Sequence, residues 1–122
     1  MVILSREEFE RRHPLRVPDA TALPQDRGAV LRGNVSFDED TAFRGVIRGD
    51  VIVKSDVQLS LQGVIRGSLT LEPGAVVYLS GVVKRNLNLG GSAAIDGVVS
   101  GDVVARGGGA LHINGVVKGK VR

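Results

Sequence analysis

Hydrophobic and polar residues alternate with a period of two along most of this chain. From residue 45 to residue 121, 24 of the 39 odd-numbered positions hold Ala, Val, Ile or Leu, and 12 of the others hold Gly. Most even-numbered positions in the same stretch are polar or charged. Because successive side chains of a strand point to opposite sides, the alternation predicts β-strands with odd residues buried and even residues facing outward.

A short string of Gly or Ala followed by Val recurs within this alternation. It begins at residues 29, 45, 63, 81, 97 and 115, so the spacing is always 16 or 18 residues. Because both spacings are even, the odd-numbered positions stay on the same side of the strands in every repeat. An apolar residue also recurs at every sixth position from Ile47 to Ile95. Three such hexads make one coil. The sequence therefore predicts an all-β fold, a single-stranded, three-sided β-helix of about six coils.

The first residues differ from the repeat. Ser5-Arg6-Glu7-Glu8 is a capping-box pattern, which predicts a short helix to about Arg12. Prolines follow the predicted helix, so the remainder is predicted to be extended. The chain is thus divided into an N-terminal arm, residues 1–28, and a β-helix repeat domain, residues 29–122.

The repeat resembles that of the bactofilins. Phe43–Val51 (FRGVIRGDV), Leu61–Leu69 (LQGVIRGSL) and Ile95–Val103 (IDGVVSGDV) follow the family pattern apolar-x-Gly-x-Val-x-Gly-Asp-Ile/Val. Bactofilins are bacterial cytoskeletal scaffolds whose right-handed triangular β-helix polymerises end to end without nucleotide. The resemblance covers residues 29–122 and none of the arm. It implies a right-handed β-helix that self-assembles, with no catalytic residues and no cofactor.

A column of valines follows the first residue of each repeat, where the family usually has a polar residue. These positions are even, so the side chains should point outward and stack into a stripe of the kind that marks interfaces. The stripe, here called the valine ridge, consists of Val30, Val46, Val64, Val82, Val98 and Val116. We expect it either to contact another chain or to be covered by the N-terminal arm.

A basic column is predicted beside the valine ridge. It consists of Arg32, Arg48, Arg66, Lys84 and Lys118. One interpretation is a solvated face whose charges deter sheet aggregation, and the other is a surface for an acidic partner. The next outward column includes Asp50 and Asp102, which supply some opposite charge and favour the first interpretation. Arg85 replaces a Gly at a corner, and its charge should turn it outward.

Both ends of a β-helix present strand edges, which invite pairing unless they are capped. At the N-terminal end, Phe37 and Phe43 are bulky enough to close the core, and the arm is expected to fold across them. At the C-terminal end, Val103, Val117 and Val121 should be partly uncovered. The C-terminal end is therefore the predicted contact for end-to-end assembly.

Composition and charge narrow the function classes further. The chain has 122 residues, 17 Gly and no Cys, which indicates a single domain without disulfides or a thiolate metal site. The net charge is +3, but no basic cluster is interleaved with aromatic residues, so no nucleic-acid partner is expected. Gly115–Lys120 lacks the full P-loop pattern, and His13 and His112 are interpreted as plain surface residues. No catalytic, metal or cofactor site is predicted.

The chain is thus expected to be a cytoplasmic, non-enzymatic scaffold whose main partner is another copy of itself. The apolar run Val2–Leu4 is too short to span a membrane, and a weak membrane contact through it is the most that it allows. The alternative is a binding protein, such as an immunity protein or antitoxin, that neutralises a toxin with a rigid face of the β-helix. The repeat favours the scaffold, and the non-repeat arm favours the binding protein.

Overall fold

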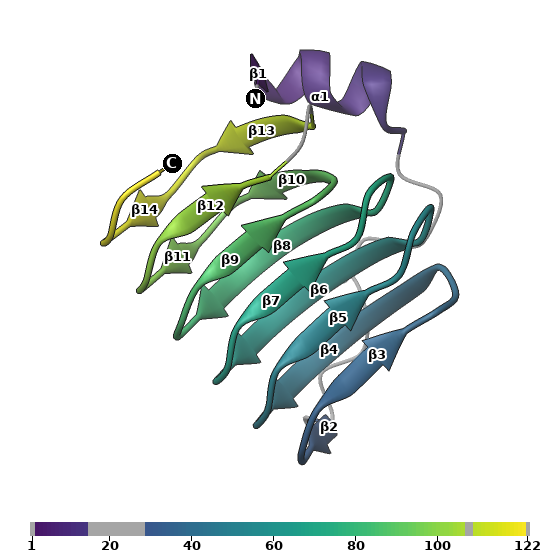
Figure 1. Cartoon of the computed structure of the whole chain (residues 1–122), viewed down its shortest axis with the longest axis vertical. Helices are drawn as coiled ribbons and strands as arrows, with labels where there is room; N and C mark the ends of the chain where they lie inside the picture. Colours follow the sequence, from purple (N-terminus) through teal and green to yellow (C-terminus); the bar gives the residue numbers. More distant parts are fainter. Residues whose placement is uncertain (1, 15–28, 107–108, 122) are drawn as a thin grey trace.

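The repeats form a β-solenoid of about five turns, with a short helix at one end (Figure 1). The computed structural model describes residues 2–14, 29–106 and 109–121. In this part of the chain, fourteen strands lie in a nine-stranded and a five-stranded sheet. All strand pairs are parallel, as expected where each coil stacks on the previous one.

The nine-stranded sheet contains three long strands, β4 (Thr41–Ile47), β6 (Gln58–Ile65) and β8 (Val76–Val83). Toward the C-terminal end the same path is divided between short strands, β10 (Ser92–Ile95) and β11 (Val98–Val99), then β13 (Ala110–Ile113) and β14 (Val116–Val117). Strands β1 (Val2–Ile3) and β2 (Ala29–Leu31) form its two edges. The five-stranded sheet consists of β3 (Val35–Phe37), β5 (Val51–Val53), β7 (Leu69–Leu71), β9 (Leu87–Leu89) and β12 (Val103–Ala105).

A column of stacked glycines divides the nine-stranded sheet lengthwise. Gly45 and Gly63 have φ angles of 153° and 140°, a region that L side chains rarely adopt. A Cβ atom on Gly63 would lie 1.8 Å from the carbonyl oxygen of Gly45, so no larger residue fits. We call the part before this glycine column face one, the part from it onward face two, and the five-stranded sheet face three.

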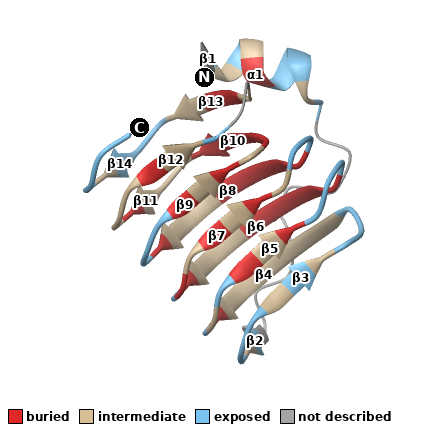
Figure 2. Cartoon of the chain, viewed as in Figure 1, coloured by how far each residue is buried: buried red, intermediate tan, exposed pale blue. Residues whose placement is uncertain are grey.

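Odd-numbered side chains fill the core, as the alternation predicts. Ile65, Leu69, Leu87 and Val103 are fully buried. Buried residues are concentrated in the middle coils and become fewer toward β2 and β14 (Figure 2). Arg85 is exposed, as predicted. The core therefore positions the even-numbered residues as regular columns on the outside.

A polar column links successive coils at the corner between faces two and three. The Oδ1 atom of Asp50 accepts a hydrogen bond from the backbone N–H of Ser68 at 2.8 Å. Each member accepts in this way from the next coil, and the members are Asn34, Asp50, Ser68, Asn86 and Asp102. The last bond, from the N–H of Lys120, ends the series because a Lys side chain cannot accept. This column therefore satisfies backbone donors at the corner, a role that the charge-based interpretation missed.

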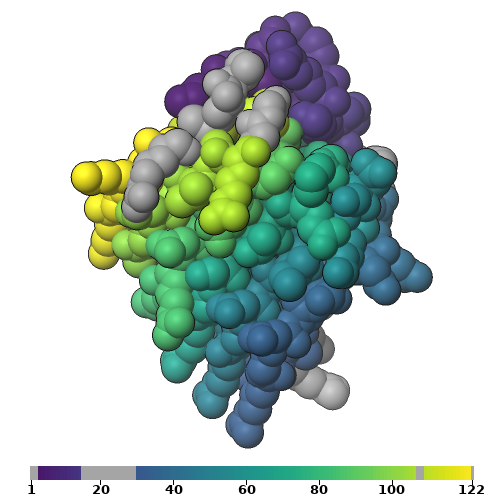
Figure 3. All heavy atoms as spheres, in the orientation of Figure 1, coloured from purple at the N-terminus to yellow at the C-terminus, as the bar shows by residue number. Residues whose placement is uncertain are grey.

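The described part of the N-terminal arm, residues 2–14, packs at the C-terminal end of the solenoid (Figures 1 and 3). Strand β1 pairs with β13, with Ile3 opposite Leu111. Helix α1 (Arg6–Arg12) begins where the capping box predicts, and the Ser5 Oγ atom accepts a hydrogen bond from the Glu8 N–H at 3.3 Å. The extended segment predicted after the helix lies largely outside the described residues.

Helix α1 is held on the outside of face one by a small apolar cluster. Phe9 is fully buried against Val76, Tyr78, Ala94 and Ala110, all at even, outward positions. The Phe9 and Tyr78 rings meet edge to face, with centroids 5.4 Å apart. The described residues of the arm, 2–14, therefore pack on face one and not across Phe37 and Phe43, because apolar outward residues on face one accommodate Phe9. Residues 15–28, to which the same expectation applies, lie outside the described part of the chain.

Candidate interaction surfaces

The valine ridge lies on face two with the stacking that the sequence predicts. Val46 is opposite Val64, Val64 is opposite Val82, and the register continues to both ends of the column. The terminal members, Val30 and Val116, are 50% and 52% exposed, whereas the four between them are partly buried. Phe9 and Leu4 of the arm pack on face one and not on the valine ridge, whereas residues 15–28 of the arm lie outside the described part of the chain.

The basic column lies at the corner between faces two and three, and two further cations join it there. We call this the basic corner. Its basic side chains are Arg32, Arg48, Arg66, Lys84, Arg85, Lys118 and Lys120, and all seven are exposed. With the two carboxylates Asp50 and Asp102 the corner carries a net charge of +5, against +3 for the whole chain. Among the described residues, none of these seven cations forms an ion pair.

The C-terminal end is more closed than the sequence predicts. Val103 is fully buried, so its predicted exposure is wrong, because Val121 forms a parallel bridge over it. Val117 is partly buried, and Val121 itself is 41% exposed. Ile3 of β1, at the same end, is 65% exposed. This end therefore combines a strand contributed by the arm with uncovered apolar side chains.

The N-terminal end is closed by aromatic residues, as predicted. Phe37 and Phe43 pack against the core with ring centroids 6.3 Å apart, and both remain partly exposed. Among the described strands, β2 pairs only with β4, and β3 pairs only with β5. This end therefore presents strand edges around a partly exposed aromatic pair.

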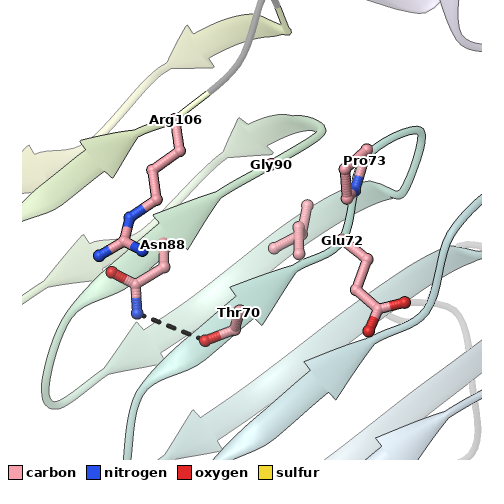
Figure 4. Close-up of a pocket in the computed structure, with 7 residues that line it drawn as sticks. Thr70, Glu72, Pro73, Asn88, Gly90 and Arg106 are labelled. Atoms are coloured by element: carbon pink, nitrogen blue, oxygen red, sulfur yellow. Dashed lines mark hydrogen bonds between the residues drawn. The ribbon is translucent and has the colours of Figure 1, made fainter.

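An open cavity of about 450 Å³ lies on face three, between Arg106 and the turn at Glu72 and Pro73 (Figure 4). The repeat that begins at residue 81 is two residues shorter than the one before it, so Gly90 occupies a recess where a longer turn would project. Asn88 donates to the Thr70 hydroxyl at 3.3 Å, and Glu72 pairs with Lys54 at 3.5 Å. These lining groups are thus engaged with neighbours, and they include no paired nucleophile and base.

The His112 side chain fastens the arm, contrary to its interpretation as a plain surface residue, and His13, itself in the arm, takes part through its backbone carbonyl oxygen and its ring contact with Phe9. The His112 Nδ1 atom donates to the Leu4 carbonyl oxygen at 3.0 Å, and the Tyr78 hydroxyl donates to the His13 carbonyl oxygen. Burial, with a contribution from Arg12, holds the pKa of His13 below its ordinary value, and burial raises the pKa of Tyr78. An ion pair between Arg6 and Asp96 adds a further tie. These groups attach the arm to face one.

Neither a metal site nor a membrane span emerges from the part of the chain that the structure describes. No three His, Asp or Glu side chains there lie close enough together to hold a metal ion. Helix α1 is far too short to cross a bilayer, and the same part contains no longer apolar helix. The features that remain as candidates are therefore surfaces: the two ends, the valine ridge and the basic corner.

Comparisons with protein-family models, with curated proteins and with solved structures found no match to this chain. The structure itself establishes a β-solenoid, whereas the resemblance to bactofilins rests on the repeat pattern alone.

Proposed function

We propose that this protein is a non-enzymatic scaffold of bactofilin type, whose copies assemble end to end in the cytoplasm. One observation carries the proposal. In the described part of the chain, the strongly exposed large hydrophobic side chains are Ile3, Val30, Val116 and Val121. All four lie at the ends of the solenoid, one at the N-terminal end and three at the C-terminal end. Exposed apolar groups concentrated at unpaired edges favour stacking of copies.

The two ends are also complementary in register. At the C-terminal end, β1 extends face one by one strand beyond β13, while face two stops at β14. At the N-terminal end, face two begins with β2. Among the described residues, face one begins one coil later, with β4. Stacking one copy on another would pair β14 with β2 and continue the valine ridge from Val116 to Val30. The last rung of one copy thus matches the first rung of the next.

The substitution Val121→Asp tests this proposal. It places a carboxylate in the stacked contact, where desolvation without a partner costs several kcal/mol. We expect the wild type to form larger species as its concentration rises in sedimentation velocity, and Val121→Asp to remain a folded monomer by circular dichroism. The matched control Val104→Asp places the same charge on the outer side of face three and should leave assembly intact. A wild type that stays monomeric at every concentration, or a Val121→Asp variant that assembles normally, would contradict the proposal.

A binding protein is the second candidate, of which an immunity protein or antitoxin is an example. The basic corner beside the valine ridge favours it, because both features lie on the side of the solenoid rather than at its ends. A monomeric wild type would make this candidate the better explanation.

A further inference from the structure

The valine ridge and the basic corner run parallel to each other along the solenoid axis. We propose that together they form a docking site for an acidic amphipathic α-helix of another protein. The site lies on the side of the solenoid, so it goes beyond the end-to-end contacts and does not depend on them.

The charge of the basic corner selects an acidic partner. Seven exposed cations and two carboxylates give it +5, so the rest of the chain carries −2. The carboxylates are already used in part, since Oδ1 of Asp50 and of Asp102 each accepts a backbone hydrogen bond from the next coil. The cations recur at each rung, roughly 4.8 Å apart, apart from Ser100 in the fifth coil. Their fields therefore add along one line instead of cancelling.

A second copy of the chain does not supply the matching charge. On the other side of the valine ridge, the outward column consists of Arg44, Gln62, Ser80, Asp96 and Asn114. Its formal charge is zero, and Asp96 is already paired with Arg6. If two valine ridges packed face to face, each basic corner would meet either the other basic corner or this neutral column. Ridge-to-ridge packing of two copies therefore leaves the basic corner without acidic neighbours, which favours a different chain as the partner.

A lipid surface is also a poor match. Interfacial binding segments insert Trp, Phe or Leu below the headgroups, whereas the valine ridge offers only short Val side chains. The four aromatic residues lie elsewhere: Phe9 and Tyr78 beneath the arm, Phe37 and Phe43 at the N-terminal end. The valines between the ends of the ridge are also only partly exposed. Such a shallow apolar line suits packing against protein side chains.

An α-helix fits the repeat of this surface. Six valines at roughly 4.8 Å intervals make a line about 24 Å long, equal to about 16 helical residues or four to five turns. The helical pitch of about 5.4 Å exceeds the rung spacing by only about 0.6 Å, so one apolar and one acidic residue per turn stay near successive valines and cations. An extended segment across a sheet face would leave backbone groups unpaired, whereas a helix satisfies its own.

The test uses a synthetic peptide and two matched variants of the full chain. The peptide is a stapled helix of about 16 residues with a Leu stripe bordered on one side by Glu, and its controls are a Lys-for-Glu peptide and a scrambled one. Val64→Ser with Arg66→Glu changes a Val-x-Arg segment on face two and at the basic corner. Val104→Ser with Arg106→Glu makes the same changes to the Val-x-Arg segment on face three. Binding is measured by fluorescence anisotropy.

We expect the wild type and the face-three variant to bind the Glu peptide equally within about twofold, and the face-two variant to bind it about tenfold or more weakly. The Lys and scrambled peptides should not bind. No binding of the Glu peptide, equal loss in both variants, or equal binding of the scrambled peptide would overturn the proposal. So would binding to anionic phosphatidylglycerol vesicles that the face-two variant abolishes while the Glu peptide fails to bind, because lipid would then be the occupant.

Discussion

Faces one and two share the strands β4, β6 and β8 and are separated only by the glycine column, yet their outer surfaces differ. On face one, the outward side chains Tyr78, Ala94 and Ala110 are buried beneath the arm. On face two, the outward valines form a ridge, and Phe9 and Leu4 of the arm pack away from it on face one. Ala94 and Ala110 are small enough to leave a recess for Phe9, whereas a uniform line of valines offers no recess. The exposure of an outward residue thus depends on whether its neighbours are small enough for another segment of the chain to pack over it.

The glycine column between the two faces should show the largest effect. In Gly63→Ala the new Cβ atom would lie 1.8 Å from the Gly45 carbonyl oxygen at a φ of 140°, so the two coils must separate. We expect a loss of more than about 4 kcal/mol in the free energy of unfolding, measured by chemical denaturation. Gly33→Ala is the control, because nothing lies within 4 Å of its Cβ position and only the φ of 83° is unfavourable. Similar losses in the two variants would show that coil stacking does not require the glycine column.

On face one, Phe9→Ala should release the arm. Removing a fully buried phenyl ring costs about 3 to 5 kcal/mol, limited here by the free energy of docking the arm. We expect faster tryptic cleavage at Arg11 and Arg12 while the β signal in circular dichroism persists. Ile3→Ala, at a side chain that is 65% exposed, serves as the control and should leave cleavage unchanged. A Phe9→Ala variant as resistant as the wild type would show that β1 and the polar ties hold the arm without this cluster.

On face two, Val64→Lys combined with Val82→Lys should have the smallest effect on the isolated chain. Both side chains point outward on the valine ridge, so we expect a loss of less than about 1 kcal/mol and unchanged cleavage of the arm. Denaturation and proteolysis of the same samples measure the two quantities. If the double variant released the arm, the contrast between face one and face two would fail.

Much of the fold follows from the even repeat spacing. One alternation phase is enough to place Leu69 and Leu87 in the core and the valines in register on the outside. Arg85 lies at an odd position, and its exposure follows instead from the cost of burying an unpaired charge. The capping box likewise predicts the start of α1, because this pattern too involves only residues that are close together in the sequence. Local patterns therefore give the coils and the positions of the candidate surfaces.

The position of the arm could not be predicted in this way, because it depends on contacts between residues about a hundred positions apart. One signal was present: Val76, Tyr78, Ala94 and Ala110 are apolar at even positions, which conflicts with a solvated face. The polar column was misread for a related reason. In the sequence, Asn, Asp and Ser at rung spacing look like ordinary polar surface residues. Their role as acceptors for the backbone N–H of the next coil is visible only in the structure.

Contact between Phe9 and Ala110 also sets an order for biosynthesis. A ribosome adding about 5 to 20 residues per second makes Ala110 about 5 to 20 s after Phe9. The coils can stack as they emerge, since each touches only its neighbours. The arm is synthesised first but docks last. Until it docks, the Phe9 side chain is exposed and can bind chaperones or neighbouring nascent chains. A ribosome that stalls before the codon for Ala110 would therefore release a truncated chain whose coils are stacked but whose N-terminal arm is undocked, with the Phe9 side chain exposed.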